Sequence, residues 1–148
     1  MGIPLLSENG FLPPGVHSCG LEEMRVRFGR FQGSDQRPRL MARFESFLAE
    51  VRAAGIVRAV IINGSFVSGK AAPNDLDLLL VLPGGHDFRA DLRPTQYNVL
   101  DRNRVRRAYG FDVFVAEDNA ADYDALVRFF QRVRLQPDLS KGILRIEL

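Results

Sequence analysis

The sequence of 148 residues is poor in cysteine and has no long apolar run. A single cysteine, Cys19, excludes an internal disulfide, and nothing indicates an oxidising compartment. No apolar run approaches the roughly 18 residues that a membrane-spanning helix needs. The N-terminal stretch MGIPLLSENGFLPPG lacks the basic start and long apolar core of a signal peptide. We therefore expect a cytoplasmic protein without a membrane partner.

A large charge surplus is also missing, because the net charge is only +2. This value is too small to indicate nucleic-acid binding by itself, and we expect no stable DNA complex. Of the 20 basic residues, 18 are arginine, the better bidentate partner for phosphates and carboxylates. The two histidines, His17 and His86, lack metal-ligand spacing to each other or to Cys19, which argues against a zinc site.

What the sequence does contain is typical of one globular domain over residues 1–148, with an extended lead-in over 1–20. Apolar periodicity and Gly stops predict helices over 20–29, 38–54, 94–109 and 120–133. Apolar runs predict strands over 57–62, 75–82 and 111–115, with a final edge strand over 143–148. The expected fold is α+β (α/β-like), a mixed sheet of about four strands with helices packed on it. We expect Phe44, Phe47, Phe129 and Phe130 in the core.

Three carboxylates stand in strand-like, apolar surroundings, where an unpaired charge is costly. Asp75 and Asp77 alternate in the predicted strand 75–82, so they project from one face roughly 7 Å apart. Asp112 lies in the predicted strand 111–115. Carboxylates that meet in this way suit a hard divalent cation such as Mg²⁺. The alternatives are that Asp75 is a turn residue and that Asp112 lies at a solvated strand end.

A turn with the sequence NGS follows the predicted strand 57–62. Free backbone N–H groups there would bind a phosphate, and Gly64 would allow its close approach. Ser65 is a phosphate contact or helix cap rather than a nucleophile, because it lacks the Gly-x-Ser-x-Gly elbow. On this reasoning, a bulky residue at position 64 would disturb phosphate binding but not the carboxylates. The pattern predicts metal-assisted phosphoryl or nucleotidyl transfer.

The stretch GSFVSGKAAPNDLDLLL resembles the signature of the nucleotidyltransferase superfamily related to DNA polymerase β. The resemblance implies the nucleotidyltransferase fold, a nucleoside triphosphate as substrate and Mg²⁺ or Mn²⁺ as cofactor. It assigns triphosphate binding to Gly64 and Ser65 and metal binding to Asp75 and Asp77. Asp112 matches the third metal-binding carboxylate, which helps to activate the attacking hydroxyl. The whole chain is also similar to a small, uncharacterised bacterial nucleotidyltransferase-like family through FLPPGVH, GSFVSGK, PNDLD and KGILRIEL.

The chain departs from the minimal nucleotidyltransferases that act as antitoxins at two triphosphate-contacting positions. Ser68 stands where those proteins commonly have Arg, and Asn74 stands where they have Ser. Ser68 remains a candidate triphosphate contact, and Lys70 is the candidate for the missing positive charge.

These observations favour a Mg²⁺-dependent enzyme that moves an NMP unit from an NTP to a hydroxyl of a protein, an RNA or a small molecule. A partner protein is one expected source of the acceptor, as in the antitoxin-like relatives. The alternative is a weakly active or inactive binding module, such as an antitoxin or nucleotide sensor. A third class, a nucleic-acid-binding protein that uses the arginines at 102–107, needs more positive charge than the chain has.

Overall fold

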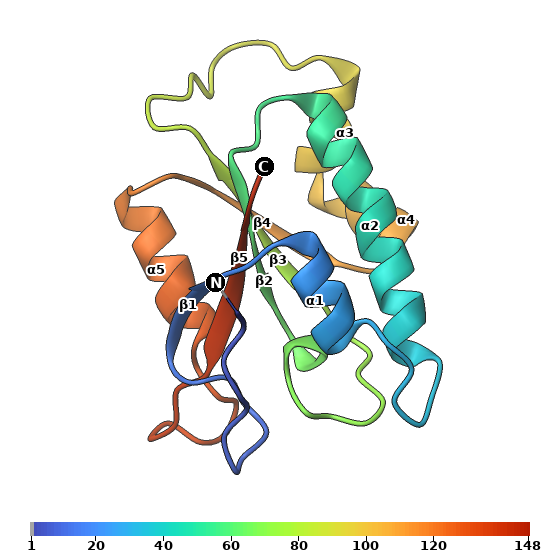
Figure 1. Cartoon of the computed structure of the whole chain (residues 1–148). Coiled ribbons are helices and arrows are strands. Elements are labelled where there is room, and N and C mark those ends of the chain that lie inside the picture. The colour runs from blue at the N-terminus through green and yellow to red at the C-terminus, as the bar shows by residue number, and fades with distance from the viewer. Residues whose placement is uncertain (1) are drawn as a thin grey trace.

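A mixed five-stranded sheet forms the centre of the computed structural model, which describes residues 2–148 (Figure 1). The strand order is β1-β5-β2-β3-β4. β2 runs antiparallel to both of its neighbours, whereas the β3–β4 and β1–β5 pairs are parallel. The strands are β1 Gly15–Ser18, β2 Ala59–Asn63, β3 Asp77–Leu82, β4 Asp112–Glu117 and β5 Gly142–Glu147.

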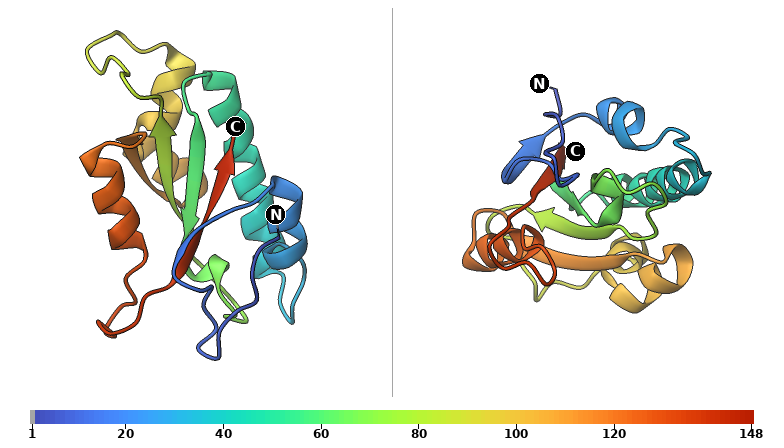
Figure 2. Two further views of the ribbon diagram at one scale, coloured as in Figure 1. Left: turned by 60° about the vertical axis from the view of Figure 1, so that its left-hand side comes forward. Right: turned by 90° about the horizontal axis from the view of Figure 1, so that it is seen from below.

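Helices cover both faces of this sheet and produce three layers (Figure 2). The helices are α1 Leu21–Phe28, α2 Gln36–Ala54, α3 Pro94–Leu100, α4 Arg102–Tyr109 and α5 Ala121–Phe130, with a short 3₁₀ turn η1 at Ser65–Val67. Side chains alternate along β3, so Leu78 and Leu80 pack with α1–α4 while Leu79 and Val81 pack with α5. Among residues 2–148, α5 is the one helix that covers the second face, which leaves one end of that face to loops.

The structure confirms the expected α+β mixed sheet and corrects its strand count. The lead-in contributes β1, which pairs with β5 from Gly15↔Gly142 to Ser18↔Arg145. β5 therefore lies between β1 and β2, and the expectation that it is an edge strand was wrong. The helix expected over 94–109 is two helices. Asp101 separates them, and its carboxylate caps α4 by accepting hydrogen bonds from the Asn103 and Arg104 N–H groups.

The expectation that Phe129 is a core residue was also wrong. Phe44, Phe47 and Phe130 are buried, whereas Phe129 is 54% exposed. Successive residues of a helix point about 100° apart, so only one of two neighbours can face the sheet. Phe130 takes that position and packs against Phe114, with ring centroids 5.6 Å apart.

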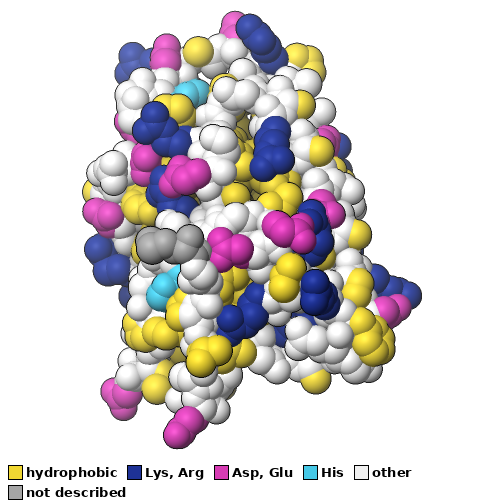
Figure 3. Space-filling model, in the orientation of Figure 1, with side chains coloured by type: hydrophobic (Ala, Val, Ile, Leu, Met, Phe, Trp, Pro, Cys, Tyr) yellow, Lys and Arg dark blue, Asp and Glu magenta, His cyan; other side chains and the backbone are white. Residues whose placement is uncertain are grey.

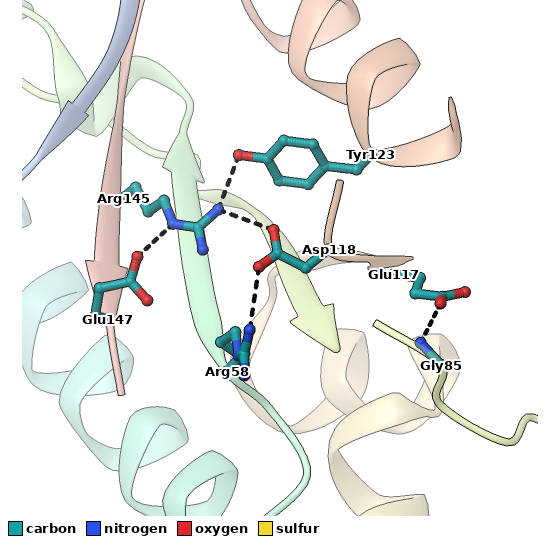
Figure 4. A network of polar contacts seen from close by, with 7 residues as sticks. All are labelled: Arg58, Gly85, Glu117, Asp118, Tyr123, Arg145 and Glu147. Carbon is teal, nitrogen blue, oxygen red and sulfur yellow. Dashed lines mark hydrogen bonds and ion pairs between the residues drawn. The ribbon is translucent and has the colours of Figure 1, made fainter. Parts of the chain in front are cut away.

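A polar network joins the start of α5 to β5 and to the segment that follows β4 (Figure 4). Arg145 of β5 donates to the Tyr123 hydroxyl of α5 at 2.9 Å and lies 3.5 Å from Asp118, which follows β4. Arg145 also contacts Glu147 at 2.7 Å. These contacts join α5, the end of β4 and β5, so they hold the second layer in place.

The surface carries both signs of charge. Lys and Arg side chains are interspersed with Asp and Glu over the face seen in Figure 3. Among residues 2–148, no helix combines the length and the apolar character needed to cross a membrane.

Candidate functional site

The candidate site begins with one row of three polar residues across neighbouring strands. Asn63, the last residue of β2, is the register partner of Asp77, the first residue of β3. Asp77 is in turn the register partner of Asp112, the first residue of β4. Each of the three lies two or four residues along its strand from residues that pack under α5. Because side chains alternate between the faces of a sheet, all three project from the face that carries α5. The fold thus places two carboxylates and an amide side by side at one end of the sheet.

Electrostatics couples Asp77 to the two other acidic residues predicted from the sequence. Burial, and after it the Asp75 and Asp112 carboxylates, raise the pKa of Asp77 to about 6. Lys141, which directly precedes β5, opposes this rise. Carboxylates raise the pKa of another carboxyl group only when they lie close to it. The charges of Asp75, Asp77 and Asp112 therefore act on one small region.

Asp75 lies outside the strand that the sequence favoured for it, in agreement with the alternative that leaves only Asp77 in that strand. The strand begins at Asp77, so Asp75 lies in the preceding segment. Its Oδ1 accepts a hydrogen bond from the Ser65 N–H at 3.0 Å and another from the Ser65 hydroxyl. The Phe66 N–H donates to the Asp75 carbonyl at 3.3 Å. The amides of Ser65 and Phe66, expected to be free for a phosphate, are thus bonded to Asp75.

Gly64 holds this segment close to the end of β2. Its φ of +105° lies in the region that favours glycine. A Cβ added there would come within 2.6 Å of the Asp75 carbonyl oxygen. The sequence-based expectation that position 64 is independent of the carboxylates was therefore wrong, because Gly64 and Asp75 are in backbone contact.

A buried arginine anchors the turn formed by residues 64–70. Arg37 of α2 is only 1% exposed. Its guanidinium donates to the carbonyls of Phe66 at 2.8 Å, Ser68 at 2.7 Å and Lys70 at 2.7 Å, and to the end of α1 at 3.2 Å. The Ser68 hydroxyl faces inward and donates to the Ser65 carbonyl at 2.6 Å. Ser68 thus shapes the turn, whereas the exposed Lys70 side chain remains available to a ligand.

Two cavities meet beside Asp75, and we call them the turn cavity and the loop cavity. The turn cavity has a volume of about 680 Å³ and lies between turn 64–70 and the N-terminal segment around Gly10. The loop cavity has a volume of about 690 Å³ and lies under loop 131–141, beside Asn63 and Asp77. The residues that line both cavities are Asp75, Val133, Arg134 and Lys141. These four residues form a shared wall.

Both lysines of the chain lie at these cavities, although all 18 other basic residues are arginines. Lys70 and Lys141 line the turn cavity, and Lys141 also lines the loop cavity. Burial lowers the pKa of Lys141, against the opposing effect of the Asp75 and Asp77 carboxylates. A half-buried ammonium opposite two carboxylates can bind an anionic group that also approaches the acid cluster.

The donor atoms suit a hard divalent cation, although they are not assembled as a cage. Carboxylates and an amide oxygen are the ligands that Mg²⁺ prefers, and the buried Asn63 Oδ1 has no hydrogen-bond partner among the described residues. Within residues 2–148, no three His, Cys, Asp or Glu side chains are placed to hold a metal ion. The reason is that Asp112 forms an ion pair with Arg106 at 2.5 Å, while Asp75 faces Ser65. A metal would need substrate oxygens or water to complete its shell.

Among the residues of this site, sequence reasoning missed Asn63, Lys141, Arg37 and the wall residues Val133 and Arg134. Asn63 stands at the end of a predicted strand, directly before Gly64, and this position was a usable signal. In the structure the strand register places Asn63 next to Asp77. Lys141 directly precedes a predicted strand, which was a weaker signal. Nothing local marked Arg37, since its carbonyl partners are 29 to 33 residues away in the turn.

Comparisons with known proteins identify a family but no characterised relative. No curated protein and no solved structure matches the chain. One family model matches residues 4–147, which is nearly the whole chain. The chain therefore belongs to the DUF6932 family, which is described as a family of unknown function.

Proposed function

We propose that this protein is a nucleotidyltransferase that moves an NMP unit from an NTP to a hydroxyl acceptor with Mg²⁺ or Mn²⁺. The row formed by Asp77 and Asp112, with Asp75 close enough to raise the pKa of Asp77, carries the proposal. The neighbouring turn cavity supports it, because Lys70, Lys141 and Arg134 offer positive charge to a triphosphate. The Gly-Ser…Asp-x-Asp resemblance supplies the reaction type.

In the proposed reaction, the acceptor hydroxyl oxygen forms a bond to the α-phosphorus while the bond to the pyrophosphate oxygen breaks. The hydroxyl proton passes to the Asp112 carboxylate, which lines neither cavity and must first separate from Arg106 and turn toward Asp77. Lys70 and Lys141 bind the triphosphate, and the Ser65 hydroxyl fixes Asp75 beside it. Asp75, Asp77 and Asp112 would hold the cation. When bound, the cation neutralises phosphate charge and favours attack on phosphorus.

A second candidate function is a binding module that retains the nucleotide site without catalysis. The Arg106–Asp112 ion pair favours this candidate, because it occupies the carboxylate assigned to proton transfer. In such a module the NTP would bind at the turn cavity and no product would form. An antitoxin or a nucleotide sensor would behave in this way.

The two lysines allow a direct test of nucleotide binding. Reductive methylation followed by mass spectrometry should show that ATP with Mg²⁺ protects Lys70 and Lys141 but not the N-terminal amine. Equal modification with and without nucleotide would contradict a nucleotide site here.

Incubation with labelled NTPs and a lysate then separates enzyme from binding module, because only an enzyme yields labelled product. Asp77→Asn should abolish labelling, whereas the control Asp91→Asn, at an exposed position outside the site, should not change it.

A further inference from the structure

We infer that the loop cavity binds the acceptor, and that the acceptor is a small molecule with a hydroxyl on an apolar body and an anionic group. This inference rests on the proposed function. It starts from the shared wall, because the two cavities are otherwise lined by different residues. Turn 64–70 reaches only the turn cavity, whereas Asn63 and Asp77 reach only the loop cavity. The shared wall therefore separates the turn cavity, which turn 64–70 lines, from the loop cavity, which Asn63 and Asp77 line.

In-line displacement assigns one reactant to each side of this wall. The attacking and leaving oxygens lie roughly opposite each other about the phosphorus. If the pyrophosphate portion lies in the turn cavity beside Lys70, the α-phosphate comes to the shared wall at Asp75 and Lys141. The attacking hydroxyl must then approach from the opposite side, which is the loop cavity.

The lining of the loop cavity indicates the chemistry of the acceptor. Apolar side chains from the end of α5 and from loop 131–141 form much of it: Phe129, Val133, Leu135, Pro137 and Leu139. Arg132 adds a guanidinium that lines only this cavity and suits a carboxylate or a phosphate. Its volume of about 690 Å³ lies in the range of small-molecule pockets.

Loop 131–141 presents two apolar side chains to solvent at this cavity. Phe129 is 54% exposed and Leu135 is 93% exposed. Leu135 also adopts a φ of +64°, which is unfavourable for a residue with a bulky side chain. The base of the loop is closed by the Lys141 N–H, which donates to the Gln131 carbonyl at 2.8 Å, and by the Arg132↔Ser140 bridge. A closed loop that holds a strained, exposed leucine beside a polar site suits contact with a ligand.

The test uses ¹⁵N-labelled full-length protein and NMR titration with defined probes. The acceptor probe is 4-hydroxyphenylacetate, and 4-hydroxyphenylethanol is the matched probe without the negative charge. Inorganic triphosphate with Mg²⁺ reports separately on the turn cavity. We expect the acceptor probe to shift amides of residues 132–139 and to bind at least fivefold more tightly than the uncharged probe.

Variants locate the interaction. Phe129→Ala and Arg132→Gln should each weaken binding of 4-hydroxyphenylacetate at least threefold. The controls Phe88→Ala, which is 59% exposed, and Arg128→Gln, which is an exposed α5 residue, should leave it unchanged. Shifts confined to residues that do not line the loop cavity, or wild-type affinity in the two test variants, would overturn the inference.

The triphosphate arm distinguishes this inference from the proposed function. Triphosphate binding at turn 64–70 without acceptor-probe binding at the loop overturns the acceptor site alone. Failure of triphosphate to bind overturns the proposed function and, with it, the acceptor role of the loop cavity. An acidic peptide with a central tyrosine that binds more than tenfold more tightly than 4-hydroxyphenylacetate would replace the small molecule by a peptide acceptor.

Discussion

Asp77 and Asp112 are register partners on the parallel strands β3 and β4, so their carboxylates leave the sheet side by side on the face that carries α5. Two like charges in this position oppose each other unless a cation or a proton intervenes. The repulsion costs more free energy at Asp77, because its side chain is half-buried. The Asp112 side chain is 42% exposed and is paired with Arg106. The pair thus costs folding free energy that a bound cation would relieve.

The first prediction is that Asp77→Asn stabilises the protein at pH 7 but not at pH 3.5. The pKa of Asp77 rises from 3.8 to about 6 on folding, through burial and then through Asp75 and Asp112, while Lys141 acts in the opposite direction. The folded state therefore binds more protons between pH 4 and 6, so this contribution to stability falls as pH rises through that window and is fully lost above it.

The full pKa difference corresponds to about 3 kcal/mol, and solvent screening of the half-buried side chain reduces the expected gain to about 1 kcal/mol. Urea unfolding at the two pH values measures this gain, with Asp91→Asn as the control. Destabilisation at pH 7 would mean that Asp77 has a structural partner.

The second prediction is that Arg106→Gln tightens binding of Mn²⁺ two- to fivefold. Arg106 contacts Asp112 at 2.5 Å, so a cation must compete with it for that carboxylate. Exposed ion pairs contribute at most about 1 kcal/mol, which limits the gain to this range. Calorimetric titration with Mn²⁺ measures it. Arg107→Gln removes the same charge from the next position of α4, and an equal gain in that variant would show a general charge effect instead.

Much of the fold was predictable from the sequence because its signals are local. The β-branched and leucine runs of β2 and β3 and the glycines after α1 and α2 place those elements within two residues of their observed bounds. β1 was not predictable, since Gly15–Ser18 becomes a strand only by pairing with β5, more than 120 residues away. Its sequence alone indicates an extended segment and nothing more.

The candidate site was predictable in its residue types but not in its contacts. Asp77 and Asp112 stand out as charges in apolar strands, and their register makes them neighbours. Asp75 stands in a similar sequence context to Asp77, yet its carboxylate accepts a hydrogen bond from Ser65. This contact forms because Gly64 lets the turn after β2 approach the segment that precedes β3. Arg37 gave no signal, since a buried arginine with four carbonyl acceptors looks like any helical arginine in sequence.

The third prediction is that Arg37→Met loosens turn 64–70 and lowers the free energy of unfolding by about 2 kcal/mol. Methionine fills similar space but leaves buried carbonyl groups, among them those of Phe66 and Ser68, without their donor. Hydrogen exchange should accelerate at the amides of residues 66–70 and stay unchanged at Arg145 of β5, which has no hydrogen bond to that turn. Arg37→Lys should restore part of the protection, because one ammonium cannot reach all four carbonyls.

The last prediction is that Gly64→Ala lowers the free energy of unfolding by about 2–4 kcal/mol and weakens triphosphate and Mn²⁺ binding together. Two costs combine at this position. A φ of +105° is unfavourable for alanine, and the new Cβ would lie 2.6 Å from the Asp75 carbonyl oxygen. Relief of that overlap requires the segment at Asp75 to move, so the carboxylate shifts along with the turn.

Gly33→Ala is the matched control for this prediction. Gly33 also has a positive φ, +83°, but a Cβ there meets nothing within 4 Å. Its replacement should therefore cost only the conformational strain, about 1 kcal/mol, and should leave both ligands bound as before. Denaturant unfolding and paired titrations with triphosphate and Mn²⁺ measure the difference. Loss of triphosphate binding with full retention of Mn²⁺ binding in Gly64→Ala would mean that the turn and the carboxylates act independently, despite their backbone contact.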